Sequence, residues 1–540
     1  MILTKTYHRL VKLLCVGALL PAAVSCTLVE ERIDRMAGGP NVPADTEIQM
    51  RLEPGEIAKR ALPPGPLKIT IREAILLCLE NNRSLVVERL NPAIRQTFED
   101  QERAVFDPAV NAEATAGRVK GERLARSGSE TESFTTDAAE GSLSLVQYFP
   151  TGTTVALEAD TLVDSSSLYE DDFYTTRLGM TVNQALLRGF GTDVNLARLR
   201  QARLDTRMSE YELRGFTESL VAEVESTYWE FALARRQIEI VEESLKVARQ
   251  QLDETKALIA VGRLARSELA AVQAEVASQE QALIDAAAAK DSIRLQLLRL
   301  LNPAGPAIWQ REIELIHQPT LPEIKLEDVE QHVAVSRRMR PILNEARLEI
   351  LHGDLELVKT RNGLLPLMDL FVTLGKSGYA NSFGESFRNI DRDSYDALAG
   401  VRFNYPIFNR DARAAHQRAL MSRDQAQKAL ENLSQLVEVD VRTAFIDVNS
   451  AKQQIAASSV TRKFNEEKLR TETEKLRVGK STSFLVAQAQ RDLLVSRIAE
   501  VRALANYLTA LIDLYLQDGS LLVRRGIAAP GREPVMVSEK

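Results

Sequence analysis

The sequence predicts a mainly α-helical protein with a smaller β-strand part, built as two internal repeats that each contain a long antiparallel helical hairpin. Three observations support this fold class. Apolar residues recur at heptad spacing through long stretches without proline, the pattern occurs twice, and short segments between the helices alternate apolar and polar residues. Aromatic residues make up only 5% of the 540 residues, which favours long helices over a thick globular core.

Residues 1–25 are predicted to be a signal peptide. Basic residues precede a short apolar run, Leu13 to Val24, which is too brief to span a membrane as a helix. The run ends in "AAVSC", which resembles a bacterial lipoprotein cleavage site, so Cys26 is the predicted lipidation site. The alternative is plain secretion, with Cys26 as a structural residue.

Segments rich in proline and glycine, or in polar residues, divide the rest of the chain. Residues 26–68 contain "LPPGPLK" and are predicted to form an extended tether. A polar linker over residues 302–325 separates a first repeat, residues 69–301, from a second, residues 326–518, and residues 519–540 are expected to be a flexible tail. No run of 18 apolar residues follows the signal, so any passage across a membrane is not made by helices.

The long helices of the two repeats are related by an offset of 217 residues. Six positions of the first repeat recur every seven residues, and five of their six counterparts are again apolar; the first series is Val224, Phe231, Ile238, Leu245, Leu252 and Ile259. Such spacing winds helices around each other along a narrow buried seam. The charged exception in the second series is Arg462, which either forms an interior ion pair that fixes helix register or extends its head into water.

Each long helix is predicted to end at a Val-Gly pair, in a bend over residues 261–263 of the first repeat and 478–480 of the second. Glycine adopts the left-handed conformation at a helix end at little cost, which lets the chain reverse. Ser267, and Ser481 or Ser483, are the expected caps of the returning helices. Each repeat is therefore predicted to be a helical hairpin.

Strands are predicted over about residues 108–187 and 365–408. The last strand of each repeat alternates apolar and polar residues, and an offset of 221 matches the two strands face for face. The polar residues of these two strands are Thr181, Asn183, Arg402 and Asn404. The first repeat carries 36 additional residues, which predict another hairpin turning at Pro150 to Gly152 that either widens the sheet or projects from it.

Strands with one apolar and one polar face fit a soluble sandwich or a transmembrane barrel with lipid outside and water inside. One or two hairpins per repeat are too few for a sandwich core. Within hydrocarbon a sheet must close on itself, and about four to six strands cannot enclose water. Closure of such a barrel therefore requires several copies of the chain.

The sequence resembles the TolC-like outer-membrane efflux protein family over about residues 70–518. The resemblance is carried by "REAILLCLENNRSL", by "NQALLRGFGTDVNLAR" and "NYPIFNRDARAAHQRA" at the strand-to-helix passages, and by the two Val-Gly bends. It implies a homotrimer that forms an α/β-barrel tunnel, with a transmembrane β-barrel in the lipid of the outer membrane and coiled-coil hairpins in the periplasm. It also implies a lipid anchor and two partners, a periplasmic adaptor protein and an inner-membrane transporter. The expected function is an export duct for drugs, metals or proteins.

The resemblance further implies a gate and an adaptor contact at the helix bends. The residues assigned to this site are Val261, Gly262, Glu268, Val478, Gly479, Leu485 and Gln488, and the polar strand residues named above are assigned to the barrel lumen. Leu485 and Gln488 occupy positions that are acidic in the best-known family member, whereas Glu268 matches an acidic position. We therefore expect a gate that closes mainly through apolar contacts, with Glu268 as a partial substitute for an acidic ring.

No catalytic constellation is found, and no cofactor is expected. The histidines of the mature chain show no paired ligand spacing; they are His317, His332, His352 and His416. "RGFGTD" lacks the Lys-Ser/Thr of a phosphate-binding loop, and Cys78 lies on an apolar helical stretch that indicates packing. A net charge of −7 without a basic run argues against nucleic acid as a partner.

The competing interpretation is a periplasmic coiled-coil spacer or envelope tether without a pore. The strand faces distinguish the two functions. A duct requires one continuous apolar band facing lipid, whereas a spacer tolerates charges on both faces of its strands. The strand near Val110 is the weakest support for a duct, because its apolar face is mostly alanine.

Overall fold

The computed structural model describes residues 65–124, 128, 130–167, 170–303, 308–316 and 326–536. The predicted signal peptide, Cys26, most of the tether and His317 lie outside these described residues. The described chain divides into two compact units. The first contains residues 94–206 and 349–427, and the second contains residues 65–93, 207–348 and 428–536.

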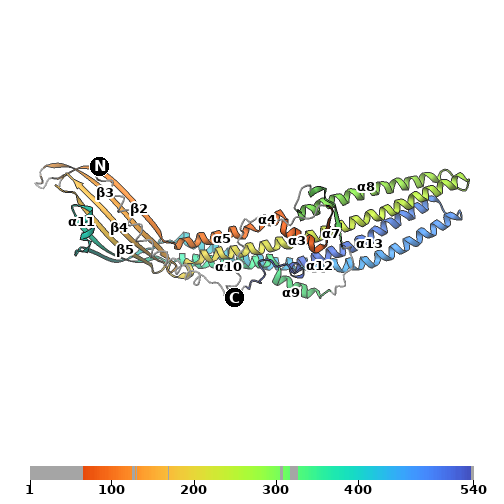
Figure 1. The fold of residues 1–540 in the computed structure, drawn as a ribbon. Helices are drawn as coiled ribbons and strands as arrows, with labels where there is room; N and C mark the ends of the chain where they lie inside the picture. Colours follow the sequence, from red (N-terminus) through yellow and green to blue (C-terminus); the bar gives the residue numbers. More distant parts are fainter. Residues whose placement is uncertain are drawn as a thin grey trace, which may run out of the picture. The chain divides into compact units, whose positions relative to one another are not determined.

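The first unit holds a six-stranded antiparallel sheet in the order β2-β3-β4-β5-β7-β8 (Figure 1). Its strands are β2 (Ala109–Leu124), β3 (Thr131–Phe149), β4 (Thr153–Ser166), β5 (Phe173–Ala185), β7 (Leu367–Ala380) and β8 (Tyr395–Asn404). All six lie within the two predicted strand segments. The additional hairpin of the first repeat forms part of β3 and β4, so it widens the sheet instead of projecting from it.

The helices before and after the strands of the first repeat are α3 (Ile71–Asn81), α4 (Arg83–Glu88), α5 (Leu90–Arg103), η1 (Ala104–Phe106), α6 (Thr192–Asn195), α7 (Ala197–Ala260) and α8 (Glu268–Leu301). The described helices of the predicted linker, the second repeat and the tail are η2 (Ile308–Gln310), α9 (Val329–Met339), α10 (Pro341–Gly363), α11 (Phe383–Arg388), η3 (Asn389–Asp391), α12 (Arg410–Arg477), α13 (Ser483–Gln517) and α14 (Leu521–Arg524). The 64 residues of α7 make a helix of roughly 100 Å.

The core of the second unit is formed by the buried apolar residues along one side of each long helix. Val224 and Val441, which the offset of 217 relates, are both fully buried in one cluster with residues of α3 and α13. No member of either heptad series is exposed. Cys78 is buried in the same cluster, and this burial raises the pKa of its thiol to about 12, which keeps the thiol protonated and unreactive.

Both long helices end in the same Schellman motif. Gly262 and Gly479 have φ angles of 76° and 73°. In each bend the glycine N–H donates to the carbonyl three residues earlier at 3.0 Å, and the following N–H donates to the carbonyl five residues earlier at 2.9 and 2.8 Å. The glycines at the two bends therefore take the left-handed conformation that the sequence predicts.

The predicted caps of the returning helices are confirmed only in part: Ser267 occupies the N-cap position of α8, whereas neither Ser481 nor Ser483 caps α13. Ser267 makes no side-chain capping bond. At the second bend the cap is Thr482, whose hydroxyl accepts from the backbone N–H of Leu485. Ser481 instead donates its hydroxyl to Glu472 at 2.7 Å, and Ser483 is already the first residue of α13. Three hydroxyl residues in a row cannot be ranked as caps without the backbone geometry.

Two segments that the sequence assigns to irregular structure are ordered. Leu67 to Ile69 (β1), at the end of the predicted tether, pair in parallel with Ile313 to Leu315 (β6) in the predicted linker. In the predicted flexible tail, Leu521 and Leu522 of α14 are buried, and Val535 donates its N–H to Asn344 at 2.9 Å. These apolar segments are too short to show a period, and only their tertiary contacts hold them.

A half-buried glutamate is expected to make the stability of the second unit depend on pH. Burial, and secondarily Glu212, raise the pKa of Glu345 to about 7. Its folded-state pKa exceeds the unfolded value, so its contribution to stability is complete below about pH 4.5 and is lost as pH rises to about 7. We expect Glu345→Gln to raise the melting temperature at pH 8 and to leave it unchanged at pH 4, measured on the detergent-solubilised protein.

The control for this prediction is Glu349→Gln, which changes an exposed glutamate of the same helix. A similar gain at pH 8 in both variants would show that the effect is not specific to the half-buried carboxyl group.

Candidate functional site

The strand register sorts the side chains of the sheet into two faces. Because successive residues of a strand point to opposite faces, each register row belongs wholly to one face. One row joins Val110, Leu145, Leu157, Met180 and Leu374 across five strands, with Ala397 on the sixth. We call the face that carries this row the apolar face.

The apolar face is an exposed apolar band around this row; on the same face, Lys376 follows Leu374 by two residues, and the ion pair of Arg118 and Asp137 lies further out on β2 and β3. The exposed fractions of Val110, Leu157 and Val401 are 68%, 46% and 54%, although all three are large aliphatic residues. On β4 this face runs from Val155 to Val163 with Thr161 as its one polar residue, a span of nine residues that matches the roughly 9–11 residues of a tilted membrane-spanning strand. The sequence leaves β2 as the weakest strand, yet the register places its valine in the same apolar row as Leu145.

The opposite face, which we call the polar face, carries the four residues that the sequence assigns to a lumen. Thr181 lies opposite Thr373, with their hydroxyl oxygens 3.3 Å apart. Asn183 lies opposite Phe371, and the guanidinium of Arg402 lies over the ring of Phe371 at 5.7 Å. Asn404 is two residues further along β8 and therefore shares this face.

Arg177 links three strands of the polar face, and the sequence analysis did not identify it. Its guanidinium donates to both carboxylate oxygens of Asp396 on β8, at 3.1 and 2.8 Å, and lies within 3.7 Å of Glu158 and Asp160 on β4. The arginine side chain crosses β7 because Gly375 leaves room for it; a Cβ there would lie 2.7 Å from the guanidinium. A glycine in the middle of a strand was the available signal for such a close approach.

At the bends the structure exposes the paired valines and the residues that open α13. Val261 and Val478 have exposed fractions of 70% and 68%. Leu485 and Gln488 are also exposed on the first turns of α13. The same apolar side chain is thus presented to solvent at both bends.

Glu268 joins the two bends. Its carboxylate accepts the backbone N–H of Ser483 at 2.8 Å, so the first residue of α8 caps the start of α13 from the other repeat. An anion at a helix N-terminus also interacts favourably with the helix dipole. This contact between repeats could not be read from the spacing of residues along the chain.

About two turns further along the helices, an ion pair with a buried glutamate links α8 to α13. Glu275 is only 1% exposed, and its carboxylate accepts from Arg491 at 2.6 Å and from Gln279 at 2.7 Å. Arg491 itself is partly exposed. Removing the arginine would leave the glutamate buried without a positive partner, which is costly.

Arg462, the charged member of the heptad series, also pairs between helices. Its guanidinium lies 2.6 Å from Glu500 of α13 and 2.9 Å from Glu466 of its own helix. Its side chain is 26% exposed. The structure therefore combines the two interpretations: Arg462 pairs between helices, but at the partly exposed edge of the seam and not in its interior.

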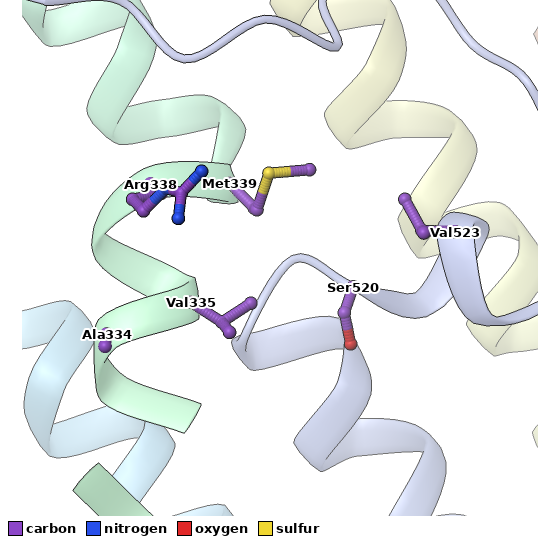
Figure 2. A pocket seen from close by; sticks show the side chains of 6 residues that line it. All are labelled: Ala334, Val335, Arg338, Met339, Ser520 and Val523. Carbon is purple, nitrogen blue, oxygen red and sulfur yellow. The ribbon is translucent and has the colours of Figure 1, made fainter. Parts of the chain in front are cut away.

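A cavity of about 310 Å³ lies in the second unit between α9 and the turn from α13 to α14. Figure 2 shows Val335 and Met339 of α9 facing Ser520 and Val523 across it. Its lining is mainly aliphatic and includes a single charged residue, Arg338. The cavity therefore lacks the paired titratable groups that acid–base catalysis requires.

None of the described helices combines the length and the apolar character needed to cross a membrane. The chain belongs to the outer membrane efflux protein family, whose sequence profile matches residues 74–303 and 336–520. It is therefore an outer-membrane export duct and not an enzyme, and the resemblance found in the sequence is confirmed.

The chain is also similar to individual proteins, in sequence to one relative and in fold to solved structures. The chain is 21% identical over 362 residues to the proteases secretion protein PrtF of Dickeya chrysanthemi, an alignment that covers 64% of this chain and 77% of PrtF. Its fold is similar to that of the CmeC outer membrane channel of Campylobacter jejuni, with a TM-score of 0.62 and 14% identity over 84% of this chain and 86% of CmeC. The outer membrane protein VceC of Vibrio cholerae gives a TM-score of 0.61 and 16% identity over 83% of this chain and 96% of VceC.

Proposed function

We propose that three copies of this chain form one barrel-and-tunnel duct that exports substrate received from a periplasmic adaptor and an inner-membrane transporter. The main evidence for this proposal is that the sheet has one apolar and one polar face and has unpaired edge strands. Strands β2 and β8 lie at the two edges and have no further partner among the described strands. In hydrocarbon their unpaired backbone groups require a partner strand, which the β2 or β8 edge of the next copy supplies.

Three sheets of six strands give a barrel of eighteen strands. A barrel diameter grows roughly in proportion to strand number, and about 16–18 strands enclose an aqueous channel. The polar face would then line the lumen, including Thr181, Asn183, Arg402 and Asn404. Such a width accommodates small solutes and also extended polypeptide, the kind of cargo for which PrtF is named.

The helices and the N-terminus complete the proposed assembly. Cys26 would carry the lipid that anchors the chain to the membrane, and the helical hairpins would form the periplasmic tunnel. The adaptor would bind at the bends, where Val261 and Val478 present equivalent exposed side chains. The gate would lie at the same bends, held by the contact of Glu268 with Ser483 and by the apolar side chain of Leu485.

Ion conductance of the purified protein in planar bilayers tests the proposed function. A duct gives discrete conductance steps from a detergent-extracted trimer. A stable monomer, or a trimer that inserts without conducting even after the bends are opened by substitution, would contradict the proposal.

The proposed gate predicts a specific effect of Leu485→Asp. Three carboxylates brought together at a closed apolar constriction repel one another and attract cations, so we expect higher conductance and a stronger preference for cations. Gln488→Asp places the same charge one turn further along α13 and serves as a positional comparison. If Leu485→Asp leaves conductance unchanged while Glu268→Ala increases it, the polar contact and not the apolar side chain holds the gate.

A further inference from the structure

The short helix α11 lies against one face of the sheet near the connection between β7 and β8 (Figure 1). The hydroxyl oxygens of Ser386 and Thr176 of β5 are 2.7 Å apart at a buried contact. Gly378 of β7 permits this packing, because a Cβ there would lie 1.9 Å from the carbonyl oxygen of Ser386. The position of α11 on the sheet is therefore closely determined.

The face that α11 covers is the apolar face. Thr176 and Gly378 are paired in the register, and each is an even number of residues from Met180 and Leu374 of the apolar row. The helix thus extends the apolar face beyond Leu178. It packs on β5 and β7, each of which has a neighbouring strand on both sides, so it does not lie at an edge where another copy would pair.

The exposed residues of α11 include two phenylalanines, beside the charged Glu385 and Arg388. Phe383 and Phe387, four residues apart and hence neighbours on the helix surface, have exposed fractions of 39% and 53%. Tyr395, at the start of β8 and paired with Lys376 on the apolar face, is 76% exposed. The buried contact of α11 with the sheet is a polar pair, whereas its two phenylalanines are partly exposed to solvent.

The strand connectivity places α11 at the end of the sheet remote from the long helices. β5 leads into α6 and α7 after Ala185, and β8 leads into α12 after Asn404. The connection that contains α11 joins the opposite ends of β7 and β8. If the helices are periplasmic, α11 lies at the outer surface of the membrane.

We propose that α11 is a membrane anchor whose Phe383 and Phe387 insert into the outer leaflet at the boundary between headgroups and hydrocarbon. This inference rests on the proposed function, because it requires the apolar face to contact lipid. Aromatic side chains are enriched at this boundary, where girdles of them flank the apolar band of membrane barrels. Continuity with the apolar face identifies the occupant as lipid and not as a soluble partner.

Spin labels on single cysteines test the anchor in proteoliposomes of phosphatidylcholine and phosphatidylglycerol. The test position is Phe387→Cys; Met180→Cys reports the apolar face and Leu398→Cys reports the polar face, where Leu398 is 59% exposed. Cys78 is buried and unreactive, and the unsubstituted protein measures background labelling at Cys26. Power saturation with oxygen and with a water-soluble nickel chelate then gives the depth of each label in the trimer.

We expect the label at position 387 to give an interfacial depth, between the deep value at position 180 and the aqueous value at position 398. An aqueous value at 387 with a deep value at 180 would refute the anchor and leave the proposed function intact. A label at 387 that neither reagent reaches would indicate a protein partner and would also refute the anchor. An aqueous value at 180 would overturn the proposed function, and the anchor with it. Phe383→Cys provides an independent second position.

Discussion

Arginine in place of Leu157 is expected to prevent insertion of the protein into the outer membrane, whereas arginine in place of the adjacent Ala156 is expected to be tolerated. Leu157 lies in the middle of the apolar row, between Leu145 and Met180. An arginine on the lipid face of a membrane barrel costs about 2–4 kcal/mol near the midplane, and a trimer bears this cost three times. Density-gradient separation of outer membranes, followed by detection of the trimer, measures the effect.

The control variant, Ala156→Arg, changes the neighbouring residue, whose side chain lies on the opposite face of the sheet. Ala156 lies opposite Thr181 on the polar face, where a charged side chain reaches water in the proposed lumen. The pair of variants has the same charge, the same strand and nearly the same depth. Equal insertion of both, or equal loss of both, would mean that the two faces of the sheet do not face lipid and water, and the duct proposal would fall.

Arg491→Ala is expected to loosen the packing of α8 on α13 and to raise conductance through the proposed gate. The substitution leaves Glu275 buried with only Gln279 as a partner. Breaking a buried ion pair by removing one member costs about 3–5 kcal/mol in measured cases. The melting temperature of the solubilised trimer and its single-channel conductance are the two measurements.

Glu275→Gln supplies the matched comparison for this ion pair. It removes the buried charge and keeps a side chain of similar shape, so the double variant Arg491→Ala with Glu275→Gln should recover much of the stability lost in the single variant. Arg497→Ala changes another arginine of α13 whose ion pairs, to Glu243 and Glu466, are more exposed. If Arg497→Ala and Arg491→Ala have equal effects, burial of Glu275 is not what makes the pair important.

Features that depend on local periodicity were predicted from the sequence in detail. The heptad series identified the seam residues, such as Val224 and Val441, because burial of one helix stripe repeats every three to four residues. The Val-Gly pairs identified both bends, since a left-handed φ favours glycine. The alternation in β5 and β8 identified the polar face, where Thr181 and Arg402 lie.

Features that depend on contacts distant in the chain were not predicted. The sequence left open whether the extra hairpin joins the sheet, and it assigned β1, β6 and α14 to irregular segments. Each of these short elements is held by partners far along the chain, such as Asn344 for Val535. The choice of Thr482 as cap likewise depends on backbone angles that neighbouring hydroxyl residues do not reveal.

The amino-acid sequence alone determined the duplicated hairpins, their bends and the two-faced strands. Each of these features produces a regular spacing of residue types along a single element. Only the tertiary structure showed which groups the charged side chains contact. Arg177 reaches Asp396, Glu268 caps α13 and Arg491 neutralises Glu275 across elements more than 200 residues apart in sequence. Ion pairing depends on distance in space, and no spacing along the chain specifies that distance.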